Sequence, residues 1–116
     1  MDTKKLYDLF LDTLSHCGSF IFNLNKNEIE YEIFEEFDIG VISFLHEDPL
    51  KQLLDSKFIT TDVYNRCLLL REKVLKLQEI GLWKIDLVKT NEKWQEVIII
   101  CDEIKEIINN KTLDSF

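Results

Sequence analysis

Apolar residues recur at intervals of three and four along most of the chain, the spacing that places side chains on one face of an α-helix. Three stripes each extend over about four turns or more, which is enough to define a helix. They consist of Leu6, Phe10, Leu14, Cys17, Ile21 and Leu24, of Val63, Cys67, Leu70, Val74 and Leu77, and of Trp94, Val97, Ile98, Cys101, Ile104 and Ile108. Gly18 lies within the first stripe and is expected to bend or end its helix.

Residues that begin and end helices flank these stripes. Thr60 or Thr61 is suited to capping the helix of the second stripe, and Gly81 is suited to ending it. Asp48 and Pro49 have the pattern of an N-cap followed by the first helical residue. A further short helix is therefore predicted after residue 48.

Residues 28–38, EIEYEIFEEFD, are compatible with two structures. As a helix, the segment places Ile29, Ile33 and Phe37 on one face and most of its carboxylates on the other. As a strand, it alternates acidic and apolar residues at its start, but the sequence FEEF then breaks the alternation. The helix is therefore favoured.

The limits of this acidic helix are predicted from its flanks. Asn27 is the expected N-cap, with Glu30 three residues later as in a capping box. At the other end, Ile39 and Ile42 would fall on the acidic face of a continued helix. The helix is therefore expected to stop or kink near Gly40.

Together these elements predict one all-α domain over residues 1–116, a compact helical bundle of about five helices. A minor alternative is an α+β fold with a short strand element near residues 28–45 or 82–88. The second of these segments is a candidate because its apolar and charged residues alternate.

Negative charge is concentrated in one part of the sequence. The chain has 22 acids and 14 bases, a formal net charge of −8. Eight acids and no lysine or arginine lie between Lys26 and Lys51, so the rest of the chain has 14 acids against 14 bases. The eight acids are Glu28, Glu30, Glu32, Glu35, Glu36, Asp38, Glu47 and Asp48. The whole excess of negative charge therefore belongs to this segment.

Several classes of protein are disfavoured by what the sequence lacks. No apolar run approaches the roughly 20 residues of a membrane span, and MDTKKLYDLF lacks the apolar stretch of a secretory signal, so a cytoplasmic location is expected. Cys17, Cys67 and Cys101 are far apart and form no CxxC pair, which is typical of reduced core thiols. A net charge of −8 would repel nucleic acid.

Candidate catalytic chemistry is sparse. His46, Glu47 and Asp48 place a histidine beside two carboxylates, but a second histidine one helical turn away, as a zinc helix requires, is missing. The three glycines are too dispersed to cradle a phosphate. We therefore predict no enzyme, no catalytic residues, no metal site and no cofactor.

The acidic segment itself has the character of a binding surface. Like charges at i and i+4, such as Glu28 with Glu32 and Glu32 with Glu36, repel by a few tenths of a kcal/mol each, and no interleaved base relieves them. Tyr31 would be an exposed aromatic among carboxylates, which is typical of an interface anchor. The predicted partner-binding residues are Glu28, Tyr31, Glu32, Glu35, Glu36, Asp38, Glu47 and Asp48.

Two segments, FDIGVISFLHEDPLKQLL and LWKIDLVKTNEKWQEVIIICDEIKEII, resemble the small acidic immunity proteins of bacterial polymorphic and contact-dependent growth inhibition toxin systems. The resemblance covers less than half of the chain and has no motif of diagnostic spacing. It implies a non-enzymatic protein that binds and neutralises one cognate toxin domain, and it carries over no residue roles.

A cationic toxin, such as a nuclease built to hold phosphates, would complement the acidic segment. The alternative function is a phage- or plasmid-encoded DNA mimic that inhibits a host nucleic-acid-binding defence enzyme. Gene context discriminates the two, because an immunity gene is expected directly behind a toxin gene. The sequence leaves the oligomeric state open.

Overall fold

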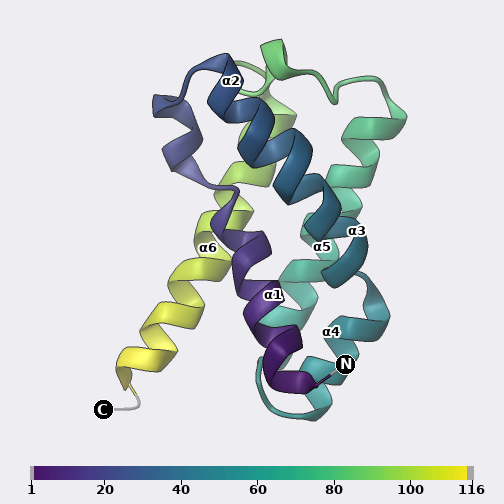
Figure 1. Ribbon diagram of the computed structural model, residues 1–116, viewed down its shortest axis with the longest axis vertical. Coiled ribbons are helices and arrows are strands. Elements are labelled where there is room, and N and C mark those ends of the chain that lie inside the picture. The colour runs from purple at the N-terminus through teal and green to yellow at the C-terminus, as the bar shows by residue number, and fades with distance from the viewer. Residues whose placement is uncertain (1, 115–116) are drawn as a thin grey trace.

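The computed structural model, which describes residues 2–114 and the side chains of residues 2–110, consists of helices joined by short connections (Figure 1). In chain order, the elements are α1 (Thr3–Ser15), the 3₁₀ turn η1 (Ser19–Asn23), α2 (Lys26–Ile29), the π-helical segment η2 (Glu30–Phe37), α3 (Asp38–Phe44), α4 (Glu47–Asp55), α5 (Thr61–Glu79), the 3₁₀ turn η3 (Ile85–Leu87) and α6 (Glu92–Asp114). Because α2, η2 and α3 follow one another without a break, they form one helix, and residues 2–114 contain five helices. The predicted all-α bundle of about five helices is confirmed.

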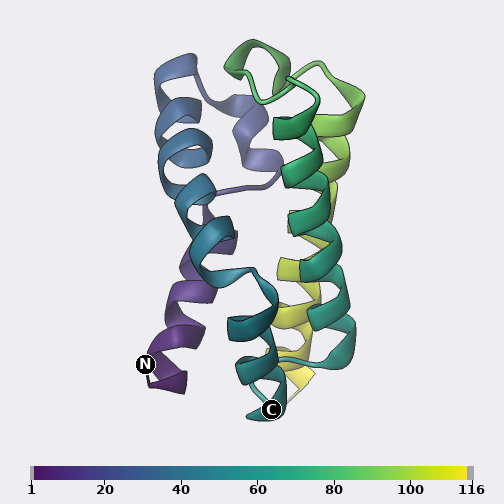
Figure 2. The ribbon, with the colours of Figure 1, turned by 90° about the vertical axis from the view of Figure 1, so that its right-hand side faces the viewer.

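The bundle has two sides. Figures 1 and 2 show α5 and α6 side by side, with α1 and the helix formed by α2, η2 and α3 opposite them. α4 contacts both α1 and α5 and so closes the lower end of the bundle. The three predicted apolar stripes are buried between these helices, apart from the half-buried Leu24 and Ile108. Within residues 2–114, no helix combines the length and the apolar character needed to cross a bilayer.

Both ends of α5 lie where the sequence predicts them. The Thr60 side chain accepts a hydrogen bond from the Val63 amide at 3.2 Å, which caps the first turn. Gly81 adopts φ 79°, and the Leu82 amide donates to the Leu77 carbonyl at 2.8 Å. This is the terminating arrangement that a glycine permits.

Gly18 ends the first helical stretch by allowing a close contact with α6. After Ser15 the chain leaves the helix, and a Cβ at Gly18 would lie 2.5 Å from both Asp102 Oδ1 and Lys105 Nζ. The Ser19 amide donates to Asp102 Oδ1 at 3.1 Å. The helix therefore ends where predicted, and the glycine allows η1 to pack against α6.

Residues 82–88 are a connection and not a strand, so that part of the α+β alternative is wrong. Trp83 stacks on the buried Trp94 with 4.7 Å between ring centroids. Trp94 Nε1 also donates to the Leu82 carbonyl at 2.7 Å. The alternation of the sequence reflects packing around this tryptophan pair.

Two helix starts differ from the prediction. Asn25, not Asn27, caps α2: its side chain accepts from the Glu28 amide at 2.9 Å, and Glu28 Oε1 accepts from the Asn25 amide at 3.0 Å. Both asparagines precede a glutamate by three residues, so the local signal alone could not choose between Asn25 with Glu28 and Asn27 with Glu30.

α4 begins at Glu47, with His46 as the N-cap residue, so Asp48 is not the cap. Pro49 is therefore the third helical residue and not the first. The first turn tolerates this shift because its amide groups have no acceptor within the helix.

The helix does not stop at Gly40, contrary to the prediction, and continues to Phe44. Gly40 is buried, and a Cβ at this position would lie 2.8 Å from Thr13 Cβ of α1. The glycine therefore permits a close helix–helix approach and does not end the helix. With residues 28–44 helical, the other strand alternative is also wrong.

The three cysteines are buried and free. Burial raises the pKa of the Cys67 thiol to about 12. Burial, together with a hydrogen bond involving Cys17, also raises the pKa of Cys101. The prediction of core thiols is confirmed.

Candidate functional site

The continuous helix of residues 26–44, called the acidic helix from here on, buries one face in the core and exposes much of the remaining surface to solvent. Ile29, Ile33 and Phe37 are buried, as predicted, and Val41 one turn later is buried as well. Its central segment η2 is π-helical, a rare conformation that occurs frequently at functional sites.

The predicted partner-binding residues point in different directions. Glu32 and Glu36 face α1, Asp38 faces α5, and exposed side chains lie between these two edges. The exposed members on the acidic helix are Glu28, Tyr31 and Glu35, whereas Glu47 and Asp48 lie beyond it in the first turn of α4. The structure thus brings six of the eight residues onto one helix but not onto one flat surface.

His16, the residue that follows α1, lies among three carboxylates. Its Nδ1 is 2.6 Å from Glu32 Oε2, and its Nε2 is 3.4 Å from Asp12 Oδ2 and 4.0 Å from Glu36 Oε2. The side chain of His16 is only 15% exposed. The imidazole therefore ties α1 to the acidic helix and, when protonated, offsets the repulsion between Glu32 and Glu36.

Tyr31 extends this cluster to the surface. Its ring lies edge-on to His16 at 6.3 Å, and its hydroxyl donates to the Glu36 carboxylate. The charge of Glu36, followed by desolvation and the charge of Glu32, raises the pKa of the Tyr31 phenol, because each of these disfavours a phenolate. The π-helical turn helps to bring residues five apart, such as Tyr31 and Glu36, onto the same face.

Asp38 and Glu28 are each used by the fold. Asp38 Oδ1 accepts from Gln78 Nε2 at 3.0 Å, which links the acidic helix to α5. Glu28 is exposed, but one of its oxygens closes the capping box with Asn25. Each of these carboxylates therefore accepts a hydrogen bond from an amide group and, among the described side chains, has no lysine or arginine beside it.

Four further acids carry no such contact. Among the described side chains, Glu30, Glu35, Glu47 and Asp48 are exposed and take part in no ion pair or side-chain hydrogen bond. Glu47 and Asp48 lie in the first turn of α4, where the helix dipole favours negative charge. Glu30 and Glu35 have no such compensation.

Several bases of the chain pair with acids outside this segment. Among the described side chains, the ion pairs that involve a lysine or arginine are Lys4 with Asp8, Lys26 with Asp86, Arg66 with Asp62 and Glu103, Lys73 with Glu96, Lys76 with Glu79, and Lys105 with Asp102. None of the eight acids between Lys26 and Lys51 is in this set. The segment therefore keeps its negative field in the folded molecule.

Three of the clustered groups could ligate a cation. The donor atoms of Asp12, His16 and Glu36 lie within 4.8 Å of one another, and imidazole with carboxylates suits a divalent ion. However, the short contact of His16 with Glu32 accounts for the orientation of the ring without a metal. The predicted lack of a metal site stays a prediction.

Sequence reasoning missed four residues of this surface. Asp12 and His16 precede the acidic segment and join it only through the packing of α1. Ile39 and Ile42 were expected where the helix stops or kinks near Gly40, but they lie on the continuing helix and are 62% and 58% exposed. The i, i+3 spacing of two isoleucines after a run of acids was the available signal.

Comparison with protein-family models, with curated proteins and with solved structures finds no significant match for this chain.

Proposed function

We propose that this protein is an immunity protein that binds and neutralises a cognate cationic toxin domain, a nuclease, through the acidic helix. The observation that supports the proposal is the absence of any lysine or arginine partner for the eight acids between Lys26 and Lys51, among the described side chains. On other helices the fold does place bases beside acids, for example Lys4 beside Asp8, Arg66 beside Asp62 and Lys73 beside Glu96, whereas within the described side chains it places no lysine or arginine beside these eight.

Such a field suits an inhibitor that must act quickly. Complementary charges raise association rate constants to about 10⁸ to 10⁹ M⁻¹s⁻¹ at low salt, against about 10⁵ to 10⁶ for neutral pairs. A toxin that holds nucleic acid carries a cationic cleft, which is the complementary surface. An interface of standard size buries about 800 Å² on each partner, so α1 and the first turn of α4 would contribute beside the acidic helix.

The experiment is co-expression with the protein encoded by the gene directly upstream in the same genome. We expect the two proteins to co-purify, and we expect this chain to abolish the toxicity of the other. Glu30→Lys with Glu35→Lys should slow association at least tenfold at low salt and flatten its salt dependence. These residues are exposed and make no contact that the fold depends on.

The matched control is Glu72→Lys with Glu106→Lys, which changes the net charge equally at exposed positions on α5 and α6. This control should slow association much less. Equal slowing by both double variants would mean that only the overall charge matters and that the acidic helix is not the docking surface. A neighbouring gene without any toxic product would favour the DNA-mimic alternative.

A further inference from the structure

The outward side of the acidic helix is apolar at one end. Tyr31, Glu35, Ile39 and Ile42 follow one another at spacings of four, four and three, and we call them the outer ridge. Tyr31 is 50% exposed, Ile39 62% and Ile42 58%. Glu35 is exposed as well, so the ridge passes from carboxylates to two adjacent isoleucines within two turns.

Single exposed apolar residues are common on protein surfaces and need no explanation. Ile39 and Ile42 differ because they are neighbours on α3 and are more exposed than any other large apolar residue among the described side chains. They also lie beside the region of densest negative charge. The combination defines a surface of mixed chemistry, with an apolar end and an anionic end.

We propose that Ile39 and Ile42 are the apolar anchor of this interface and enter an apolar depression at the edge of the partner's cationic surface. The inference rests on the proposed function and adds the chemistry of the partner: a protein whose lysines and arginines border an apolar patch. The carboxylates guide the encounter, and the isoleucines prolong the complex, because buried apolar contacts act mainly on the dissociation rate.

Charge selects this occupant over the others. A second copy of the chain would bring two acidic helices together, and an anionic membrane or a nucleic acid would be repelled by the same carboxylates. A cationic protein is attracted by the field and can also supply an apolar patch. Such a protein can pair its bases with the carboxylates at one end of the outer ridge and cover the isoleucines at the other.

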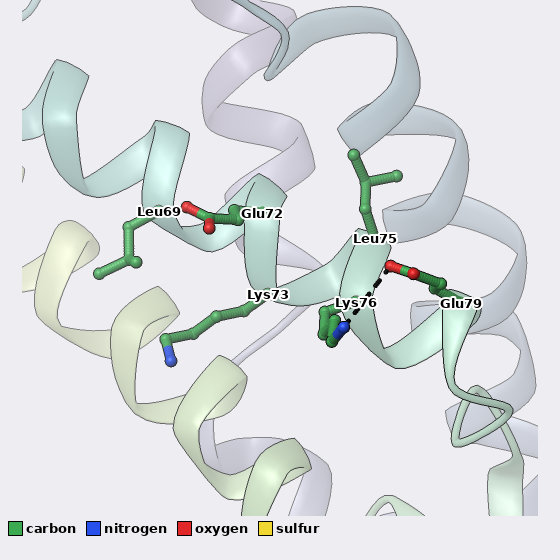
Figure 3. Close-up of a pocket in the computed structure, with 6 residues that line it drawn as sticks. All are labelled: Leu69, Glu72, Lys73, Leu75, Lys76 and Glu79. Atoms are coloured by element: carbon green, nitrogen blue, oxygen red, sulfur yellow. Dashed lines mark ion pairs between the residues drawn. The ribbon is translucent and has the colours of Figure 1, made fainter.

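The outer face of α5 provides a contrasting surface. Figure 3 shows Leu69 and Leu75 there with charged residues of both signs between and beside them. Lys76 Nζ lies 3.8 Å from Glu79 Oε2, and Lys73 Nζ lies 3.1 Å from Glu96 Oε2 of α6. This face has exposed leucines but no net field, so it serves as the matched control.

The size of the effect follows from the exposed area. Complete burial of an isoleucine contributes about 1.5–3 kcal/mol, and more than half of each side chain is still exposed in the free protein. Each isoleucine that becomes buried in a complex should therefore strengthen binding roughly five- to twentyfold.

The test uses two synthetic peptides of equal length and charge, one containing lysines and leucines and one containing lysines and serines. Titrations of the whole protein followed by NMR give both affinities and the residues affected. We expect the leucine peptide to bind more tightly by at least the roughly five- to twentyfold that burial of one isoleucine gives, with shifts at Ile39 and Ile42. Ile39→Ser with Ile42→Ser should abolish this advantage and leave the affinity for the serine peptide unchanged. Isoleucine and serine have similar helix propensities, so the variant should keep its helix.

Leu69→Ser with Leu75→Ser is the control and should keep the advantage of the leucine peptide. Equal binding of both peptides, or an advantage that survives the isoleucine substitutions, would overturn the anchor while leaving the acidic docking surface in place. If neither peptide binds near the acidic helix, the proposed function loses its docking surface as well.

Discussion

The close approach of α1 to the acidic helix at Gly40 makes a prediction about stability. Changing Gly40 to alanine would place a Cβ 2.8 Å from Thr13 Cβ, and closer still to the Oγ1 atom of the same threonine. Thr13 is buried and its hydroxyl donates to the Leu9 carbonyl at 2.9 Å, so it has little freedom to move. The added methyl must therefore push the two helices apart.

Two opposing terms set the magnitude. Overpacking costs about 1–3 kcal/mol, whereas replacing glycine by alanine within a helix gains about 0.5–1 kcal/mol. Three atoms of Thr13 crowd the added methyl, which places the overpacking cost in the upper part of its range, so the free energy of unfolding of Gly40→Ala should fall by about 1–2 kcal/mol. For a chain of this length, that corresponds to a decrease in Tm of roughly 4–8 °C.

The assay is urea and thermal unfolding followed by circular dichroism. Thr13→Ala removes two of the three crowding atoms, so the double variant with Gly40→Ala should recover about 1 kcal/mol relative to additive behaviour. Ser43→Ala, at an exposed position on the same helix, is the control and should change little. A Gly40→Ala protein as stable as the parent would refute the close helix contact and, with it, the way α1 presents His16 to the acidic helix.

Three other predictions concern individual side chains. His16→Ala should lower the free energy of unfolding by about 1–2 kcal/mol in urea denaturation, because it leaves the facing carboxylates without their shared partner; unchanged stability would contradict that role. Glu36→Gln should lower the pKa of Tyr31, since the Glu36 charge is the main cause of the raised value. The measurement is a titration of phenolate absorbance with pH, in which the curve of the Tyr31→Phe variant is subtracted to isolate the signal of Tyr31. The raised pKa favours the protonated phenol, so its contribution to stability is present below the ordinary value of 10.0 and is lost as the pH rises through the folded value. Cys67, with a pKa of about 12, should resist thiol reagents at mildly alkaline pH until the protein unfolds, and rapid labelling of the native protein would contradict its burial.

Features of the fold that depend on neighbouring residues were predictable from the sequence. The α5 helix is an example, because its N-cap at Thr60, its buried stripe and its end at Gly81 are all encoded within its own residues. For α2, the sequence predicted that an asparagine caps the helix, but not which asparagine. Asn25 and Asn27 offer the same local pattern, and the choice depends on how the helix packs.

Features that depend on contacts between distant residues were not predictable in this way. Gly40 looks like a helix end when only its neighbours are considered, whereas its contact with Thr13 shows that it serves packing. The pairing of His16 with Glu32 joins two helices that the sequence does not place together. The π-helical turns of η2 also alter the rotation per residue, which an assumed 100° per residue cannot anticipate.

The way in which the fold stabilises the acidic helix without neutralising its charge supports the proposal that the charge serves to bind a partner. Repulsion within the acidic helix is reduced by local means, through the Asn25 cap on Glu28, the imidazole of His16 and the amide of Gln78. A single lysine at the exposed position of Glu35 would reduce the same repulsion more simply. Hydrogen bonds from neutral groups such as the Asn25 and Gln78 amides stabilise the helix without reducing its charge, whereas a lysine would weaken the field at long range. A surface stabilised in this selective way is suited to attracting a cationic partner over a distance, and the exposed isoleucines at its end are suited to holding that partner once it has arrived.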